Sequence, residues 1–312
     1  TILTNQIQIR LGGYGPPTTS FSRALKFIGN RLEGEFGKEI DIKYVWNIMD
    51  LGYRGEDILW LVEEGLLTLG YQSSSYLTNR TPELGLVDLP FLMTSNAEAR
   101  ATIDGTLGAY LSQKIEEEFN YRIVGYFENG FRHISNRLRP VRSPADLKDM
   151  KIRVLPSDVQ ARTFELLGAT PLKLDLTEAI DGVVNGNLDA QENPLANTVT
   201  YGVHKYHPHH TLTGHFYISR PIFVNRAQID GWPDELQAAL RSAAKDAVKF
   251  QRGLSEQEAI DARREIEDAE GEIIELTEDE HQQFVQAVKP QHDDARKIFG
   301  DSMFDMLTEI RK

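Results

Sequence analysis

The chain has 312 residues, of which 40% are hydrophobic and 26% charged, and a formal net charge of -13. Its length fits two lobes of roughly 150 residues each, and its acidity opposes nucleic acid and anionic membranes as partners. The absence of cysteine excludes disulfides and thiolate chemistry. No apolar run is long enough to span a bilayer, and the first residues lack a signal-peptide pattern, so we expect any export signal to have been cleaved.

The first part of the chain alternates between strand and helix patterns. Polar and apolar residues alternate over 6–13, apolar residues recur at helical spacing from Ser20, and β-branched and aromatic residues predict a strand over 40–46. A second helix is predicted to end at Gly65, and the next strand to end at Gln72. Such alternation indicates an α/β fold with a largely parallel sheet.

Capping patterns mark the helices that follow. The spacing of Ser95 and Glu98 is that of a capping box and predicts a helix to about Phe119, after which 121–136 has the pattern of a strand. Pro144 is predicted to open a short helix that leads into another strand.

The remaining elements end at residues that stop regular structure. Helices are predicted to end at Gly168 and Gly186, and a strand is predicted to stop at Pro194. A helix from Pro233 to about Asp268 would contain some 35 residues and span roughly 50 Å. We therefore expect this long helix to bridge both lobes.

Arg153 is the first candidate for a residue that binds a ligand. It lies in the predicted strand KIRVL, close to the strand end at Pro156. Ligands of open α/β sheets gather beyond the carboxyl ends of strands, and a guanidinium can make two parallel hydrogen bonds to a carboxylate. The alternative is an arginine paired with a surface acid.

Two further candidates are weaker when taken alone. Arg132 follows a glycine in ENGFRHISN at the presumed crossing between lobes. The strand LDAQENP places Gln191 and Asn193 on one face. Asn193 could donate a hydrogen bond to a carboxylate or merely close a turn.

Four histidines in HKYHPHH provide enough imidazoles for a transition-metal site. Pro208 interrupts helical pairing of these rings, and no HExxH motif follows, so the pattern favours an exposed loop. The segment DGVVNGNLDAQE partly matches a calcium loop, but Val183 occupies a position that must supply oxygen. We therefore predict no metal and no cofactor.

Several segments, in order and spacing, resemble the DctP-type substrate-binding proteins of tripartite ATP-independent periplasmic (TRAP) transporters. The segments that carry this resemblance are GLLTLGYQSSSYL, VDLPFLM, NGFRHISNRLRPVRSPADLKDMKIRV, LLGATP and DAQENPLANTV, followed by the long helix. They cover nearly the whole chain, and their ordered series is specific.

The resemblance implies roles for individual residues. Arg153 would form a salt bridge with a ligand carboxylate, and Arg132 and Asn193 would assist it. The other positions that match the family's pocket are Tyr14, Tyr71, Gln72, Ser73, Pro156, Leu176, Arg220 and Arg54. The segment WNIMDLGYRGED departs from the common pattern, so the resemblance does not identify the ligand.

The resemblance also implies a two-lobed periplasmic binding protein fold with a ligand cleft between lobes that close by a hinge motion. Lobe I would contain residues 1–129 and 221–259, and lobe II 130–220 and 260–312. The expected protein is a periplasmic monomer that does not insert into the membrane and passes a small organic acid to membrane permease subunits.

Two rival functions remain open. A hydrolase or lyase would hold an organic acid with the same arginine and transfer protons with a carboxylate, and a metal-binding protein would use the histidine cluster. For the ligand, Arg54 and Arg220 suggest a second anionic group. The aromatic side chains of Tyr14, Trp46, Tyr71, Phe216 and Tyr217 instead suggest an aromatic or apolar body.

Overall fold

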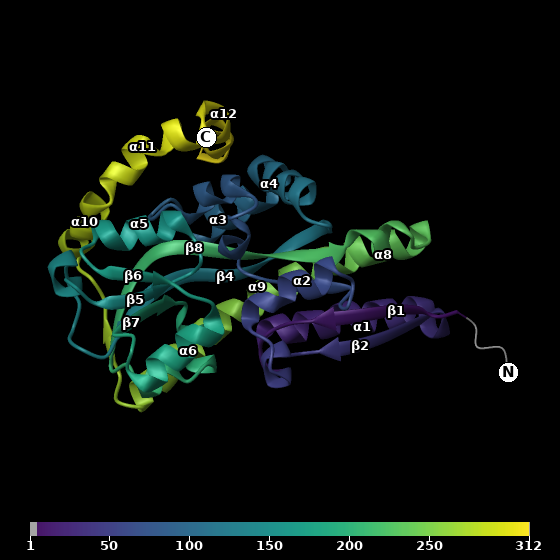
Figure 1. The fold of residues 1–312 in the computed structure, drawn as a ribbon, viewed down its shortest axis with the longest axis horizontal. Helices are drawn as coiled ribbons and strands as arrows, with labels where there is room; N and C mark the ends of the chain where they lie inside the picture. Colours follow the sequence, from purple (N-terminus) through teal and green to yellow (C-terminus); the bar gives the residue numbers. More distant parts are fainter. Residues whose placement is uncertain (1–4, 312) are drawn as a thin grey trace. The chain divides into compact units, whose positions relative to one another are not determined.

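A computed structural model describes residues 5–311 of the chain, with side chains through residue 307. The chain, drawn as a ribbon in Figure 1, divides into two compact units. Unit 1 consists of Thr1–Ser73, Ser112–Glu128 and Ser219–Glu256. Unit 2 consists of Ser74–Leu111, Asn129–Ile218 and Gln257–Lys312.

Unit 1 is built on a mixed sheet in the order β2-β1-β3-β8. β1 runs parallel to both β2 and β3, and β3 pairs antiparallel with β8. The strands are β1 (Ile7–Gly12), β2 (Ile40–Val45), β3 (Leu69–Tyr71) and the carboxyl half of β8 (His209–Asn225). The helices are α1 (Ser20–Phe36), α2 (Ile58–Glu63), α8 (Arg226–Asp230) and the first part of α9 (Asp234–Asp268).

Helix α1 begins where the sequence predicts it, because the side chain of Thr19 accepts a hydrogen bond from the Ser22 N–H. The first part of α9 packs into the same unit. Gln251 of α9 donates to Ser20 and accepts from the backbone N–H of Glu128, which joins the helix to α1 and to β4 (Tyr121–Asn136). Buried hydrogen bonds of Gln251 thus hold the first part of α9 against α1 and β4.

Unit 2 is built on strands in the order β4-β7-β5-β6. β7 pairs antiparallel with β4 and parallel with β5, and β5 pairs parallel with β6. The strands of this order beside β4 are β5 (Lys151–Val154), β6 (Thr170–Lys173) and β7 (Ala190–Asn193). The predicted α/β class is confirmed, although the sheets of both units are mixed rather than largely parallel.

Helices surround the unit 2 strands in Figure 1. They are α3 (Asn96–Asp104), α5 (Asp158–Leu166), α6 (Leu176–Asn185), α7 (Leu195–Thr200), α10 (Glu278–Ala287), α11 (Lys289–Phe299) and α12 (Asp301–Arg311). The end of α9 buries Ala262 and Ile266 against Leu195 of α7. β9 (Glu272–Ile274) then pairs parallel with β8.

Two helix predictions have different outcomes. The helix expected to run from Ser95 to about Phe119 is interrupted: α3 ends before Gly105, and α4 (Thr106–Glu118) follows it. The long helix is confirmed, because α9 begins at Asp234 and ends at Asp268. Along the chain α9 passes from unit 1 into unit 2, since the units divide after Glu256.

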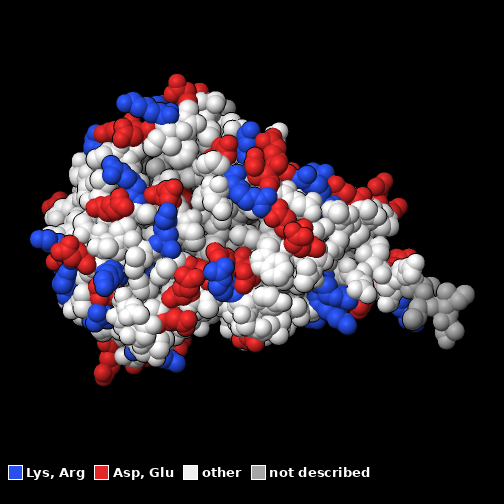
Figure 2. Space-filling view, viewed as in Figure 1, with Lys and Arg blue, Asp and Glu red and all other residues white. Residues whose placement is uncertain are grey.

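Acidic and basic side chains are interspersed over the face shown in Figure 2, and no broad area of that face is purely basic. Within residues 5–311, no helix is long and apolar enough to cross a membrane.

Candidate functional site

Arg153 lies near the carboxyl end of β5 and is 1% exposed. Its Nε donates to the backbone oxygen of Leu174 at 2.9 Å, and its Nη2 donates to Tyr76 Oη at 2.9 Å. In the part of the chain that the structure describes, no acidic side chain pairs with Arg153. A fixed guanidinium without a counter-ion is suited to bind an anion.

Tyr76 brings two of the predicted residues together. Its hydroxyl accepts the hydrogen bond from Arg153 and a second one, from the backbone N–H of Leu176, at 2.9 Å. The neighbouring Thr78 donates to the backbone oxygen of Pro156 at 3.2 Å. Arg153, Leu176 and Pro156 are therefore joined through the 3₁₀ helix Ser74–Leu77 and the residue after it.

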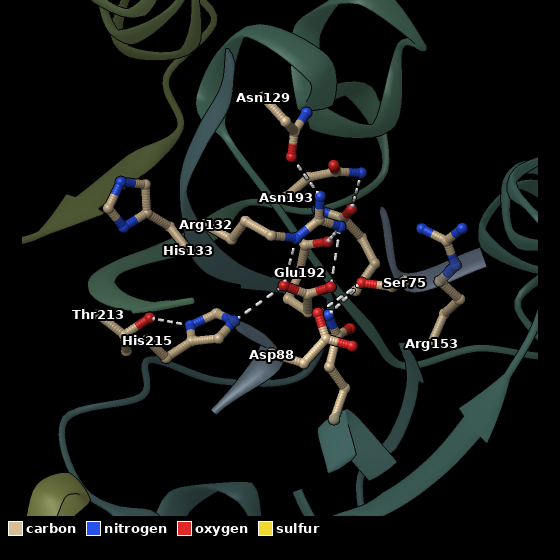
Figure 3. A network of polar contacts seen from close by, with 12 residues as sticks. Ser75, Asp88, Asn129, Arg132, His133, Arg153, Glu192, Asn193, Thr213 and His215 are labelled. Carbon is tan, nitrogen blue, oxygen red and sulfur yellow. Dashed lines mark hydrogen bonds and ion pairs between the residues drawn. The ribbon is translucent and has the colours of Figure 1, made fainter. Parts of the chain in front are cut away.

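Arg132 of β4 has a different environment, shown in Figure 3. Its Nε and Nη2 donate to the two carboxylate oxygens of Glu192 at 2.7 and 2.9 Å, and its Nη1 donates to Asn129 Oδ1 at 2.6 Å. Both members of the Arg132–Glu192 pair are buried. Arg132 is thus charge-neutralised within the protein, whereas Arg153 is not.

The charge state of this pair follows from its surroundings. Burial raises the pKa of Glu192, but the Arg132 charge and the hydrogen bond with His215 outweigh burial and leave the pKa below its usual value. Burial lowers the pKa of His215, whose Nε2 lies 2.9 Å from Glu192 Oε2. A neutral His215 therefore donates to an ionised Glu192.

Asn193 ends β7, and Pro194 follows it. Its Nδ2 donates to Gln191 Oε1 at 3.1 Å, and Gln191 Nε2 donates to Ser135 Oγ at 2.6 Å. Because β7 lies between β4 and β5, the strand places Asn193 in the same sheet region as Arg132 and Arg153. The three side chains therefore come from neighbouring strands of unit 2.

A second buried cluster surrounds Asp88. Its carboxylate accepts hydrogen bonds from Ser75 at 2.8 Å and Ser157 at 2.6 Å, while Gln160 donates to Ser75. Burial raises the pKa of Asp88 to about 6, although these hydrogen bonds oppose the shift. The cluster ties the segment before α3 to the start of α5.

In unit 1, three predicted residues gather around aromatic rings. The ring centres of Tyr14 and Tyr71 are 5.3 Å apart, and the Arg220 guanidinium lies 4.9 and 5.9 Å from those centres. A Cβ at Gly13 would lie 2.6 Å from Tyr71 Oη, so a residue without a side chain is required where the phenol approaches the backbone.

The other unit 1 candidates have partners of their own. Gln72 is buried, donates to the backbone oxygen of Gly55 and accepts from the N–H of Ser73. Arg54 is about half exposed and pairs with Glu56 and, at 3.8 Å, with Asp57. These contacts give Gln72 a local structural role and leave Arg54 neutralised by nearby acids.

The expectation that the histidine segment is an exposed loop is wrong. His207 and His210 are 0% and 1% exposed. Burial lowers the pKa of His207 to about 3 and that of His210 to about 4. β8 begins at His209, so strand pairing draws the segment inward. Among the described residues, no group of three or more potential ligands could hold a metal ion.

The sequence did not indicate that Tyr76, Asp88 and His215 take part in the buried polar contacts of unit 2. Glu192 was considered only as a possible calcium ligand. Each is an ordinary polar residue whose partner lies far away in the chain; Glu192, for example, is 60 positions from Arg132. Three of the four residues of β7 (AQEN) are polar, so Glu192 does not stand out from its neighbours in the sequence.

Comparison with known proteins decides the family. The model of the family described as DctP, bacterial extracellular solute-binding protein, family 7, matches residues 14–298. The chain belongs to this family. Members of the DctP family are binding proteins of transporters, so the chain is a solute-binding protein and not an enzyme, and the hydrolase or lyase alternative has no support.

Among relatives of this DctP-family chain is the 2,3-diketo-L-gulonate-binding periplasmic protein YiaO of Escherichia coli, which is 32% identical over 207 residues. That match covers 65% of this chain and 63% of YiaO, less than two thirds of the relative.

Solved structures agree with the fold. One is a TRAP periplasmic solute-binding protein from Xanthobacter autotrophicus with bound β-D-galacturonate, which has a TM-score of 0.88 and 26% identity and covers 97% of this chain and 99% of that one. Another is the sugar acid binding protein DctPAm from Advenella mimigardefordensis in complex with galactonate, with a TM-score of 0.91, 23% identity and coverage of 98% and 99%. The expected two-lobed binding-protein fold is thus confirmed.

Proposed function

We propose that this protein captures a small organic acid for a TRAP transporter and that Arg153 binds the ligand carboxylate. The observation that carries the proposal is the state of Arg153: it is buried, held by Leu174 and Tyr76, and has no acidic partner among the described residues. A carboxylate would supply the missing negative charge and accept two parallel hydrogen bonds. The related protein from Xanthobacter autotrophicus, with bound galacturonate, supports an acid as ligand.

In this proposal Arg132 and Asn193 assist ligand binding, while Arg153 supplies the positive charge that pairs with the carboxylate. Arg132 already donates three hydrogen bonds to Glu192 and one to Asn129. Asn129 Nδ2 is buried and has no hydrogen-bond acceptor within the described chain. A ligand oxygen that accepts from this amide would satisfy a donor that the protein leaves open.

The remaining predicted positions are part of the same proposal. Leu176 and Pro156 would border the ligand on unit 2, while Tyr14, Tyr71, Gln72, Ser73, Arg54 and Arg220 would contribute from unit 1. The protein would act in the periplasm as a monomer and deliver its ligand to membrane permease subunits. The lobe boundaries expected from the resemblance stay a prediction about which residues move together when ligand binds.

Calorimetry on the purified protein tests the ligand class. A panel of small carboxylates should contain an acid that binds, and neutral sugars of similar size should not bind. A ligand at 100 times its dissociation constant should stabilise the fold by about 2.7 kcal/mol. Mass spectrometry of material carried through purification should recover the acid unchanged. Binding of neutral sugars without binding of any acid would refute the proposal.

The hinge motion is tested separately by small-angle scattering. Saturating ligand should reduce the radius of gyration, because closure brings ligand-binding residues of both lobes around one small molecule. An unchanged radius at saturation would contradict lobe closure while leaving the ligand assignment intact.

A further inference from the structure

Asp88 ends the 3₁₀ helix Pro82–Asp88 of unit 2 and is completely buried. Its Oδ1 accepts a hydrogen bond from Ser75 Oγ at 2.8 Å (Figure 3), and its Oδ2 accepts one from Ser157 Oγ at 2.6 Å. Gln160 donates to both serine hydroxyls, through Nε2 to Ser75 and through its backbone N–H to Ser157. Both hydroxyl protons are therefore directed at the carboxylate, which accepts on each of its oxygens.

The two serines lie on the two segments that hold Arg153. Ser75 directly precedes Tyr76, whose hydroxyl accepts a hydrogen bond from Arg153 Nη2 at 2.9 Å. Ser157 lies on the turn between α5 and β5, the strand that carries Arg153. Asp88 thus joins the segment that contacts the Arg153 guanidinium to the segment that continues from the Arg153 backbone.

Asp88 differs from Glu192, the other buried acid described above. Glu192 forms an ion pair with Arg132, whereas within the described residues Asp88 forms no ion pair. A buried carboxylate without a cationic partner costs free energy, because burial removes its hydration. Burial raises the pKa of Asp88 to about 6, although its hydrogen bonds and the Arg132 charge oppose the rise. Stability alone therefore does not explain a carboxylate at this position.

The surroundings of Asp88 are fixed by helix α11. Gln291 Nε2 donates to the backbone oxygen of Val159 in α5 at 2.9 Å. His292 Nε2 lies 2.5 Å from the backbone oxygen of Pro90, which follows Asp88 closely in the chain. Helix α11 therefore holds both α5 and the segment after Asp88, so the position of the carboxylate is set by the fold of unit 2.

We infer that Asp88 is a positioning residue for the anion site: its carboxylate joins the segment that carries Tyr76 to the turn after β5 and so holds the Arg153 guanidinium in its binding orientation. This inference rests on the proposed function, in which Arg153 binds a ligand carboxylate. Hydrogen bonds to an ionised acceptor are about twice as strong as those to a neutral one. Protonation of Asp88 therefore weakens both of its links to the serines.

The affinity of the wild-type protein at two pH values is the first test. With a pKa of about 6, Asp88 is ionised at pH 7.5 and about nine-tenths protonated at pH 5.0. Apparent affinity scales with the competent fraction, so the protein should bind its probe about tenfold more weakly at pH 5.0. The probe is galactonate or galacturonate, whichever binds more tightly in calorimetry. The carboxylate of each stays ionised at both pH values.

Other titratable groups surround Asp88. Burial raises the pKa of Glu192, but the Arg132 charge and the hydrogen bond with His215 outweigh burial and keep Glu192 ionised. Burial lowers the pKa of His215 and keeps it neutral. His292 contacts the chain close to Asp88 and needs a variant of its own. The charged groups of α5 and of Pro82–Asp88 are at least partly exposed: Glu83, Asp158, Arg162 and Glu165.

Asp88→Asn copies the protonated carboxyl group, because the amide keeps one acceptor oxygen and lacks the charge. It should bind the probe at least about tenfold more weakly than wild type at pH 7.5, and with equal affinity at both pH values. A residue that served packing alone would change the melting temperature and leave the pH dependence of affinity in place. Asp158→Asn removes an exposed acid next to Ser157 and should bind as wild type at both pH values. His292→Gln should retain the pH dependence.

A measurement without ligand separates this inference from the proposed function. The Nε–H of Arg153, which donates to the backbone oxygen of Leu174, can be followed by nuclear magnetic resonance and assigned by its loss in Arg153→Lys. Its protection against hydrogen exchange, corrected for the intrinsic rate at each pH, should fall about tenfold in Asp88→Asn. The same fall is expected in the wild-type protein at pH 5.0.

Each outcome supports or overturns the inference. If Asp88→Asn binds the probe within about threefold of wild type at pH 7.5, or if His292→Gln abolishes the pH dependence, the inference is wrong while acid capture stands. If neither probe binds the wild-type protein, unchanged protection of the Arg153 Nε–H in Asp88→Asn would overturn it. If Asp88→Asn does not fold, equal affinity and equal protection of the wild-type protein at the two pH values would overturn it.

Discussion

The carboxylate of Glu192 accepts hydrogen bonds from Arg132 Nε at 2.7 Å and Nη2 at 2.9 Å, and both side chains are almost completely buried. Removing one charge would leave the other buried and unpaired, which typically costs about 3 to 5 kcal/mol. We therefore expect Glu192→Gln to lower the free energy of unfolding by about that amount, measured by chemical denaturation.

An exposed ion pair provides the control for Glu192. Arg263 and Glu267 on α9 are both about half exposed and four residues apart, so Glu267→Gln should cost only about 0.5 kcal/mol or less. If Glu192→Gln were no more destabilising than Glu267→Gln, the buried pair would not be ionic in the folded protein.

Arg153→Ala should weaken ligand binding more than any other single substitution in unit 2. Truncating one member of a desolvated charge pair costs about 2 to 5 kcal/mol, or roughly 30-fold to several thousand-fold in affinity. Arg153→Lys should restore part of the affinity. Calorimetry measures the effect, with Arg137→Ala as an exposed arginine control in the same unit. An Arg153→Ala protein that binds the acid within about threefold of wild type would show that the anchor is misassigned.

Tyr76→Phe tests whether the hydrogen bond to the Tyr76 hydroxyl positions the Arg153 guanidinium for ligand binding. The hydroxyl accepts from Arg153 Nη2 and from the Leu176 N–H, so its removal leaves two donors without this acceptor. We expect affinity to fall about tenfold, since an unsatisfied buried donor costs about 1 to 3 kcal/mol. Tyr206→Phe, at an exposed position of unit 2, should bind as wild type. Unchanged affinity in Tyr76→Phe would mean that Arg153 does not depend on this bond.

His207 and His210 should make stability fall as the solution becomes acidic. Burial lowers their pKa values to about 3 and about 4, whereas an unfolded histidine titrates near 6.5. Below about pH 6.5 the unfolded chain therefore binds protons that the folded protein does not. Each histidine should lower the free energy of unfolding by about 1 to 2 kcal/mol between pH 7 and pH 5.

Two variants assign that pH dependence. His207→Asn keeps a polar atom near the Nδ1 position that contacts Ser135, and His210→Gln keeps one near the Nε2 position that contacts the His207 backbone. Both variants should show a flatter profile of unfolding free energy against pH than wild type. The raised pKa of Asp88 makes this residue stabilise the folded protein as the pH falls, which is opposite to the effect of the histidines. Because Asp88 is present in the wild type and in both variants, its contribution cancels when their profiles are compared. A profile as steep as wild type in both variants would contradict the assignment.

The sequence by itself determined most of the local elements. Periodicity and capping residues correctly predicted helix α1, the long helix α9 and the strand that carries Arg153, because these signals depend on neighbours within a few turns of the chain. The ordered motifs identified the family, which the match over residues 14–298 confirmed. The break at Gly105 was not foreseen, since a glycine inside a helical pattern does not by itself specify an interruption.

Only the tertiary structure decided which charged groups are neutralised and which polar side chains are buried. Nothing near Arg132 in the sequence indicates that Glu192 cancels its charge, and nothing near Arg220 indicates that its neighbours are aromatic rings. The histidine segment has a polar sequence, yet strand pairing buries His210. Burial and electrostatic pairing depend on residues brought together by strand register over long separations, and this information is not local to any motif.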